Sequence, residues 1–209
     1  ESLEELPLEL KRIDKTKPLV LIVEDNKDVR FYIRDFLAPY FFLKEAIDGE
    51  QGFQLAVDKI PDLIISDVMM PKMDGFQLCE KLKSDERTSH IPIILLTARA
   101  SEQSKLKGLE KGADDYIAKP FSAKELLLRS KNLILQRQKL RDRFRKEISL
   151  EPKDIAITSA DERFLSRAMT ILEEHFDNSE FTAAIFAQRI GSSRMQLHRK
   201  LYALTGQST

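Results

Sequence analysis

Residues 61–75 read PDLIISDVMMPKMDG. The aliphatic run LIIS has the composition of a buried strand, yet it ends on the carboxylate of Asp67. A loop that contains proline and glycine follows at once. A strand needs no acidic residue at its end for its own stability, so the position of Asp67 indicates a chemical site.

Short aliphatic runs alternate with helical stretches from residue 18 to about residue 129. The runs are LVLIV, LIIS, PIILLTA and DYIA, and a more polar run, FFLKEAID, is expected near the sheet edge. Apolar strands separated by single helices are typical of a parallel sheet covered on both faces. The pattern predicts an α/β, doubly wound domain of five strands and five helices, one of them over residues 102–112.

The bulk composition limits the classes of function. The chain has 209 residues, with 34 basic and 34 acidic side chains, so any attraction to nucleic acid must come from a local patch. The single Cys79 excludes an internal disulfide and fits a reducing cytoplasm. No apolar run reaches the roughly 18 residues of a membrane span. We expect a cytoplasmic piece of a longer protein, without membrane contact of its own; an upstream segment could anchor the whole.

Polar side chains follow the predicted strands where each strand ends. Glu24 and Asp25 follow LVLIV, Asp67 follows LIIS, and Thr97 follows PIILL, while DYIA leads to Lys119. In an open parallel sheet, ligands collect at the carboxyl ends of the strands. If the first and third strands are neighbours, the three carboxylates share one crevice.

Three carboxylates in one crevice need a counter-charge. Mg²⁺ is the natural partner, because it prefers oxygen ligands and accepts a few carboxylates while it keeps several waters. The backbone carbonyl of Met69 is a candidate for a further metal ligand. Lys119 supplies a positive charge for an anion beside the metal. A carboxylate in this setting can attack a phosphoryl group, so Asp67 is predicted to be a phosphoryl acceptor.

Residues 18–136 resemble the receiver domain of bacterial two-component response regulators. The motifs that carry the resemblance are VEDN, ISDVMMPKMDG, LLTA and DYIAKPF. The resemblance implies a flavodoxin-like sheet with strand order 2-1-3-4-5. It also implies that a histidine kinase donates the phosphoryl group to Asp67, that Thr97 hydrogen-bonds it, and that Tyr116 rotates inward behind it. Glu24 departs mildly from the Asp that is usual in the family.

Two other protein families with related features fit the acidic site less well. Haloacid-dehalogenase-type phosphatases carry a second Asp two residues after the nucleophile, where this chain has Met69. A flavodoxin needs a hydroxyl-rich loop where this chain has EDNKD. A receiver-like module that binds proteins without phosphorylation is the remaining alternative. We expect no turnover enzyme beyond slow loss of phosphate from Asp67.

A purely helical pattern begins at residue 161 and continues to residue 209. Its first helix carries a predicted apolar stripe: Phe164, Ala168, Leu172 and Phe176. Residues 181–209 contain no acidic side chain, and four basic side chains form a local patch there: Arg189, Arg194, Arg199 and Lys200.

Two short helices break at Gly191, and a serine precedes the second, as in a helix-turn-helix. The segment resembles the first helix-turn-helix of AraC-type transcription regulators, which normally carry two. The resemblance implies that Met195, His198 and Arg199 project into a major groove of DNA, with nearby basic residues on phosphates. Arg194 completes the predicted set of DNA-binding residues. With one motif, DNA binding by this chain is expected to be weak or absent; the alternative is a helical hairpin with a solvated basic face.

The remaining segments are read as connectors. Residues 1–17 and 137–160 are predicted to be charged linkers. Leu126, Leu133 and Leu140 recur every seven residues, which fits either a solvated helix or a short coiled-coil dimer seam. We expect phosphorylation to favour a homodimer through helices over residues 102–111 and 122–135. The whole resembles the C-terminal part of a hybrid two-component protein whose kinase lies in the same chain, with a free-standing regulator as the alternative.

Overall fold

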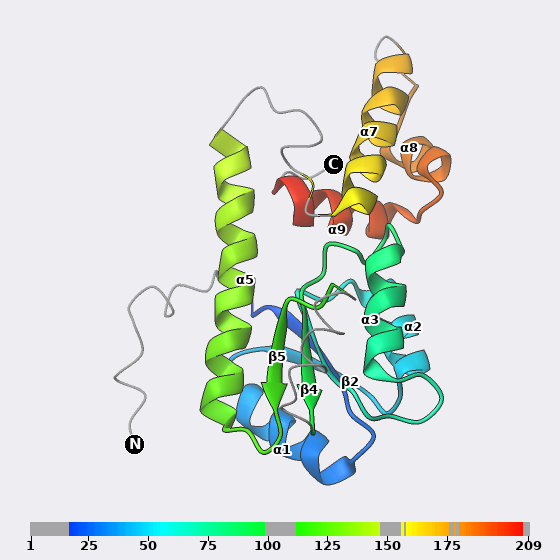
Figure 1. The fold of residues 1–209 in the computed structure, drawn as a ribbon. Coiled ribbons are helices and arrows are strands. Elements are labelled where there is room, and N and C mark those ends of the chain that lie inside the picture. The colour runs from blue at the N-terminus through cyan, green and yellow to red at the C-terminus, as the bar shows by residue number, and fades with distance from the viewer. Residues whose placement is uncertain are drawn as a thin grey trace. The chain divides into compact units, whose positions relative to one another are not determined.

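The structure is a computed structural model that describes residues 17–98, 112–146, 156, 158–175, 178 and 180–206. The chain divides into two compact units. The first unit comprises residues 1–81 and 91–137, and the second comprises residues 82–90 and 138–209. Figure 1 shows the described elements, and each unit is taken by itself below. The helix expected over residues 102–112 lies outside the described residues, apart from Gly112.

One parallel β-sheet forms the centre of the first unit. Its strands are β1 (Leu19–Val23), β2 (Phe42–Ala46), β3 (Leu63–Asp67), β4 (Ile93–Thr97) and β5 (Asp115–Ala118). All neighbouring strands are parallel, and their order is β2-β1-β3-β4-β5. The predicted five-stranded sheet with order 2-1-3-4-5 is therefore confirmed. Because β1 and β3 are neighbours, their carboxyl ends lie side by side.

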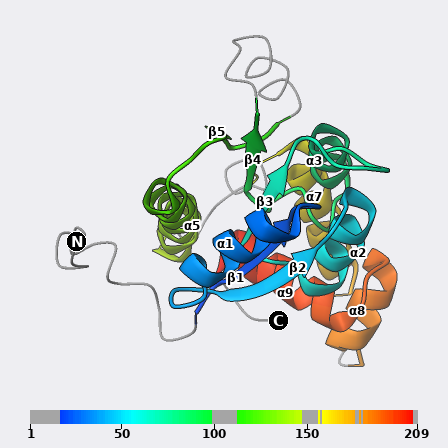
Figure 2. The ribbon, with the colours of Figure 1, turned by 90° about the horizontal axis from the view of Figure 1, so that it is seen from below.

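Helices cover both faces of this sheet. They are α1 (Lys27–Leu37), α2 (Gly49–Lys59), α3 (Gly75–Ser84) and α5 (Ala123–Lys146). Figure 2 shows α1 and α5 on one side of the sheet, with α2 and α3 on the other. Since α5 runs to Lys146, the first part of the stretch predicted as a charged linker is helical.

The apolar residues alternate between the two faces, as the pleat of a strand requires. Val20 and Ile22 of β1 pack in one core with Ile33 of α1 and Leu126 of α5. Val23 faces α2, where Gly52 leaves no room for a side chain: a Cβ there would lie 2.9 Å from a methyl group of Val23. This two-sided burial explains why β1, β3 and β4 are apolar along almost their whole length.

The seven-residue leucine spacing in α5 is only partly free for a dimer seam. Leu126 belongs to the core of the first unit, and Leu133 packs against that core. Leu140 is exposed. Of the three leucines, only Leu140 is therefore exposed for a coiled-coil seam, and both predicted alternatives stay open for the end of α5. The dimer itself stays a prediction.

The second unit contains three described helices of its own: α7 (Ser159–Glu174), α8 (Ala183–Ile190) and α9 (Arg194–Thr205). Gly191 ends α8 in the left-handed conformation, with φ of 78°, which favours glycine. Ser193 then begins α9 with a capping box. Phe164, Phe186 and Leu197 join the three helices in one apolar core. The predicted pair of short helices joined at a glycine turn is therefore present.

A buried ion pair lies inside this second unit. Lys200 Nζ lies 2.7 Å from Asp161 Oδ1, with only 3% and 0% of the two side chains exposed. Ser89 donates a hydrogen bond to the same Asp161 oxygen, and Lys200 also donates to Ser89. Lys200 is thus a buried structural cation, although its sequence position places it among the basic residues of the predicted patch. Within the described residues, no helix is both long and apolar enough to cross a bilayer.

Candidate acidic site at the carboxyl edge of the sheet

The predicted site residues come from the ends of neighbouring strands. Asp67 is the last residue of β3, and Glu24 and Asp25 follow β1 directly. In the register of the sheet, Val23 pairs with Ser66. The backbone therefore brings the two acidic positions after β1 opposite the end of β3, which is the arrangement that the sequence predicts.

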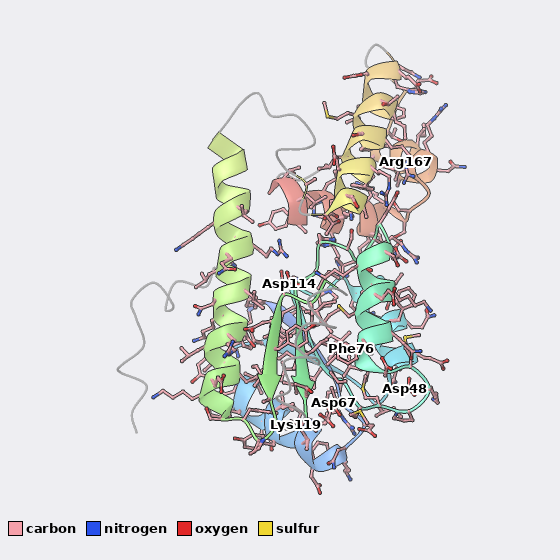
Figure 3. All side chains as sticks on the ribbon, viewed as in Figure 1. Asp48, Asp67, Phe76, Asp114, Lys119 and Arg167 are labelled. Atoms are coloured by element: carbon pink, nitrogen blue, oxygen red, sulfur yellow. The ribbon has the colours of Figure 1, made fainter. Side chains whose placement is uncertain are left out.

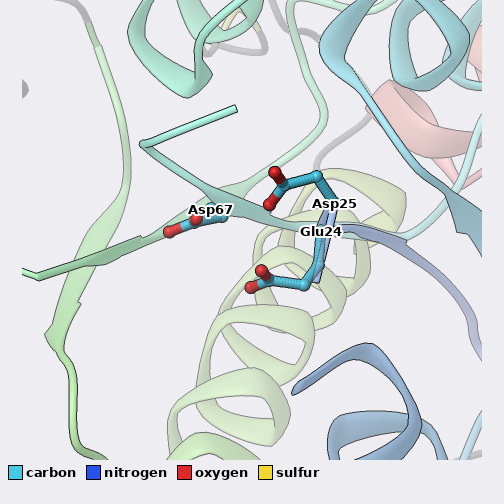
Figure 4. A group of neighbouring side chains, drawn as sticks. All are labelled: Glu24, Asp25 and Asp67. Atoms are coloured by element: carbon cyan, nitrogen blue, oxygen red, sulfur yellow. The ribbon is translucent and has the colours of Figure 1, made fainter. Parts of the chain in front are cut away.

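The three carboxylates form one cluster (Figure 4). One carboxylate oxygen from each of Glu24, Asp25 and Asp67 lies within 4.8 Å of the others. Glu24 is 1% exposed and Asp67 is 5% exposed, whereas Asp25 is open to solvent. Hard oxygen donors at this spacing suit a small divalent cation, and one solvent-facing ligand leaves room for the waters that Mg²⁺ retains. The donor set fits the metal that the sequence predicts.

Lys119 supplies the positive charge of the site. Its Nζ lies 2.8 Å from Glu24 Oε2 and 3.0 Å from Asp67 Oδ1, so one ammonium bridges two strand ends. Lys119 follows β5 at the same edge, and Figure 3 shows it beside Asp67. Three carboxylates with one ammonium carry a formal charge of about −2, which a divalent cation would neutralise.

Burial and charge shift two pKa values in the cluster. Burial raises the pKa of Glu24, and the nearby Asp67 raises it further, while the hydrogen bond from Lys119 acts in the opposite direction. Burial by itself would lower the pKa of Lys119, but its bonds to Glu24 and Asp67 outweigh this effect and raise it. Lys119 is therefore firmly protonated.

The loop after Asp67 is held close to the end of β3. The N–H of Gly75 donates to the carbonyl of Val68, and a Cβ at Gly75 would lie 2.2 Å from the carbonyl oxygen of Asp67. Only glycine allows α3 to begin this close to the strand end. Met69 lies within this loop with its side chain 71% exposed, and its carbonyl stays the predicted further metal ligand.

Thr97 and Tyr116 occupy the positions expected for switch residues on β4 and β5. Asp67 pairs with Leu96 in the register, so Thr97 is the next residue along the same edge. Thr97 is buried. The hydroxyl of Tyr116 is also buried, and it has no hydrogen-bond partner among the described residues. Burial raises the pKa of Tyr116. The inward rotation of Tyr116 on phosphorylation stays a prediction.

Two supporting contacts were not predicted from the sequence. Arg30 of α1 donates to the carbonyls of Glu24 and Asp25. Lys72 lies 2.5 Å from Asp48, which is also the N-cap of α2, and Lys72 has a positive φ of 64°. The contact of Arg30 could have been predicted, because an arginine one turn into the helix after an acidic pair can reach back to the carbonyls of that pair. The second depends on how two loops meet, which no local pattern reveals.

The side chains predicted to contact DNA lie on α9. Arg194 and Met195 are exposed, and His198 and Arg199 are half-buried. Leu197 and Leu204 lie on the buried side of the same helix, together with Lys200. The structure therefore gives α9 a buried side and leaves the four predicted residues exposed or half-buried. Their contact with DNA stays a prediction.

Comparisons with known proteins bear on the same residues. The response regulator receiver domain family matches residues 20–131. Histidine kinase P4 of Formosa agariphila is 44% identical over 192 residues, which are 92% of this chain and 14% of that protein. The phosphate regulon transcriptional regulatory protein PhoB of Pseudomonas aeruginosa is 47% identical over 117 residues, 55% of this chain and 51% of that protein. The chain thus spans about half of the second relative and a small part of the first.

A solved structure aligns with the same fold. The receiver domain of the sensor histidine kinase PA1611 from Pseudomonas aeruginosa PAO1 aligns with a TM-score of 0.54 and 30% identity. The alignment covers 57% of this chain and 98% of that domain, which has a magnesium ion coordinated in its active site cleft. The match to Histidine kinase P4 covers nearly the whole of this chain, so it includes most of the C-terminal helices.

Proposed function

Because this chain belongs to the response regulator receiver domain family, we propose that it is a phosphorelay module in which Asp67 accepts a phosphoryl group from a phosphohistidine of a kinase. The observation that carries the proposal is the bridge from Lys119 Nζ to both Glu24 and Asp67 at the carboxyl edge of the sheet. A buried acidic cluster with a single bridging ammonium suits the transfer of an anionic group.

The proposed step is an in-line displacement at phosphorus. A carboxylate oxygen of Asp67 forms a bond to phosphorus while the bond from phosphorus to the donor imidazole nitrogen breaks. The bonding electrons leave with the imidazole, and the product is an aspartyl phosphate. Lys119 would donate to one phosphoryl oxygen, and the hydroxyl of the buried Thr97, at the next position of the sheet edge, would donate to another.

The metal in this proposal is Mg²⁺. Glu24, Asp25 and Asp67 would hold it through carboxylate oxygens, and Met69 through its backbone carbonyl. When bound, it supplies positive charge that neutralises the carboxylates and the phosphoryl oxygens. The chain's own part is to keep the three carboxylates within 4.8 Å of one another and to keep Asp67 nearly enclosed at 5% exposure.

We further propose that the parent protein regulates transcription and that its kinase lies in the same chain. The extended similarity to a much longer histidine kinase supports the hybrid organisation. The glycine turn between α8 and α9 and the exposed Arg194 and Met195 support an AraC-type helix-turn-helix that contacts DNA. The single Cys79 supports a cytoplasmic location.

Transfer from acetyl phosphate tests the acceptor directly. The chain is incubated with the donor, with and without Mg²⁺, and the product is read by intact mass. We expect a Mg²⁺-dependent gain of one phosphoryl group that is absent in Asp67→Asn and retained in Asp58→Asn, an exposed acidic residue of α2. If the wild-type chain gains no phosphoryl group from acetyl phosphate or from a phosphorylated kinase domain, the acceptor proposal is wrong and the protein-interaction module is favoured.

DNA contact and dimerisation need separate measurements. Fluorescence anisotropy of a labelled duplex should show weak, salt-dependent binding. Arg194→Ala should reduce it further, because a basic side chain on a phosphate contributes to affinity whatever the sequence. Sedimentation velocity before and after confirmed phosphorylation should show a shift toward dimer. An unchanged sedimentation coefficient in the phosphorylated chain would contradict the proposed dimer.

A further inference from the structure

Arg30 makes three hydrogen bonds beside the acidic cluster. Its Nη1 donates to the backbone carbonyl of Glu24 at 2.7 Å and to that of Asp25 at 3.3 Å. Its Nε donates to a carboxylate oxygen of Glu45 at 3.2 Å. The Arg30 side chain is only 12% exposed, so this guanidinium is fixed against the backbone that carries two of the proposed metal ligands.

The start of α1 explains why Arg30 reaches back to the acidic pair. Asn26 is the N-cap of α1 and accepts from the N–H groups of Asp28 and Val29. The N–H of Arg30 bonds to the carbonyl of Asn26, so Arg30 lies on the first turn. Side chains on a helix lean toward its N-terminus, which here is the end of β1. The guanidinium therefore lies over the carbonyls of the residues that precede the helix.

We infer that Arg30 is a positioning residue for the metal site, which acts through the backbone of Glu24 and Asp25. The inference rests on the proposed function, since it concerns the same acidic cluster. Two bonds from one nitrogen fix the carbonyls of adjacent residues, and the bond to Glu45 fixes the guanidinium on β2. The peptide units of the acidic pair are thereby held, and with them the directions in which the two carboxylates leave the backbone.

The planar fork of arginine is needed for this arrangement. A guanidinium presents several N–H groups in fixed directions, whereas a lysine ammonium is a compact charge on a flexible stem. In Arg30→Lys one amine would have to serve the two carbonyls and Glu45 together, although the charge is kept. A purely electrostatic role predicts little change in this variant, but a positioning role predicts a clear loss.

Removal of the charge gives an even sharper separation. Arg30→Gln takes a cation away from an anionic site, so Coulomb attraction alone predicts tighter binding of Mg²⁺. A positioning role predicts the opposite result, because the carboxylates lose their fixed directions. The sign of the change in Mg²⁺ affinity therefore decides between the two roles.

The test measures Mg²⁺ binding to the whole chain by isothermal titration calorimetry, with melting temperature recorded for each variant. We expect the dissociation constant for Mg²⁺ to rise about tenfold in both Arg30→Lys and Arg30→Gln. The matched control is Glu45→Gln, which keeps an acceptor for Nε and both carbonyl bonds, and its Mg²⁺ affinity should stay within about twofold of the wild type.

Phosphorylation by acetyl phosphate is read in parallel. We expect a raised half-saturating Mg²⁺ concentration and a maximal rate close to that of the wild type. Unchanged or tighter Mg²⁺ binding in Arg30→Gln, with or without a lower melting temperature, would overturn the positioning role. Failure of the proposed function looks different, because the wild-type chain itself would then bind Mg²⁺ without gaining a phosphoryl group.

Discussion

Removal of the bridging ammonium should destabilise the first unit in a way that depends on pH. Lys119→Met leaves the buried carboxylate of Glu24 without the hydrogen bond and charge that now lie 2.8 Å away. Loss of one partner from a buried ion pair typically costs about 3–5 kcal/mol. Lys119 itself is 22% exposed, so solvent screens this pair only in part.

Glu24 can avoid a buried, unpaired charge by taking up a proton. The free energy of that protonation is therefore the most that Glu24 can contribute to the loss of stability. An unfolded glutamate titrates near 4.3, and each pH unit is worth about 1.36 kcal/mol, so a neutral Glu24 costs at most about 3.7 kcal/mol at about pH 7. At about pH 5.5 the same bound is about 1.6 kcal/mol. The pKa of Glu24 is higher in the folded state than in the unfolded state, so the folded protein binds this proton first as pH falls. The destabilisation caused by Lys119→Met therefore becomes smaller at lower pH.

Urea unfolding read by hydrogen exchange of β1 and β3 peptides measures this effect for the first unit alone. We expect a loss of about 3–4 kcal/mol at about pH 7 and less than about 2 kcal/mol at about pH 5.5, and Mg²⁺ should restore more stability to Lys119→Met than to the wild type. Lys124→Met, at an exposed position of α5, is the control and should change stability by less than about 0.5 kcal/mol. A loss that is the same at both pH values, or that Mg²⁺ increases, would refute the reasoning.

Three other measurements test separate parts of the chain. Lys72→Gly and Lys72→Ala both remove the bond to Asp48, but only glycine relieves the strain of the positive φ. The unfolding equilibrium constant in urea should therefore be about fivefold lower for Lys72→Gly than for Lys72→Ala. Equal constants for the two variants would exclude strain at this position. Lys200→Met leaves buried Asp161 without its cation and should weaken hydrogen-exchange protection of α7 and α9 by about 3–5 kcal/mol, whereas unchanged protection would contradict a structural role. Since the pKa of Glu24 is raised, calorimetry of Mg²⁺ binding should show weaker affinity and greater proton release as pH falls, and pH-independent affinity would argue against Glu24 as a ligand.

The sequence predicted the sheet well because burial on both faces leaves a strong local signal. The runs that became β1, β3 and β4 are apolar at almost every position, and glycine, proline or acidic residues bound them. The polar β2 was also placed correctly at the edge, where only one neighbour, β1, pairs with it. The helical stripe of α7 was predicted less well: Phe164 and Ala168 are buried, but Leu172 is 45% exposed. Periodicity identifies a helix face but not how far its partner helices extend.

The clustering of the acidic residues was predictable because it depends on where strands end. Strand ends are visible in the sequence, and a parallel sheet brings them to one edge. The contacts of Arg30 and of the Lys72–Asp48 pair depend instead on rotamers and loop geometry. The predicted basic patch shows a similar limit of sequence-based prediction, because Lys200 was counted in it as a surface cation although it is buried. That lysine is buried against Asp161, a residue 39 positions away, and no count of charges within one segment could show this.

The contacts of Lys119 have a consequence for how the site changes as it is occupied. With the three carboxylates alone, the ammonium is the only positive charge that lies within bonding distance of both Glu24 and Asp67 in the described part of the chain. A divalent cation on the same carboxylates takes over their neutralisation and weakens the hold on Lys119. The ammonium then becomes available for a new anion, and a phosphoryl group on Asp67 adds acceptor oxygens at that position. In the proposed mechanism, one side chain would thereby couple metal binding to phosphorylation. A lysine on a flexible stem would suit this position better than a rigid arginine.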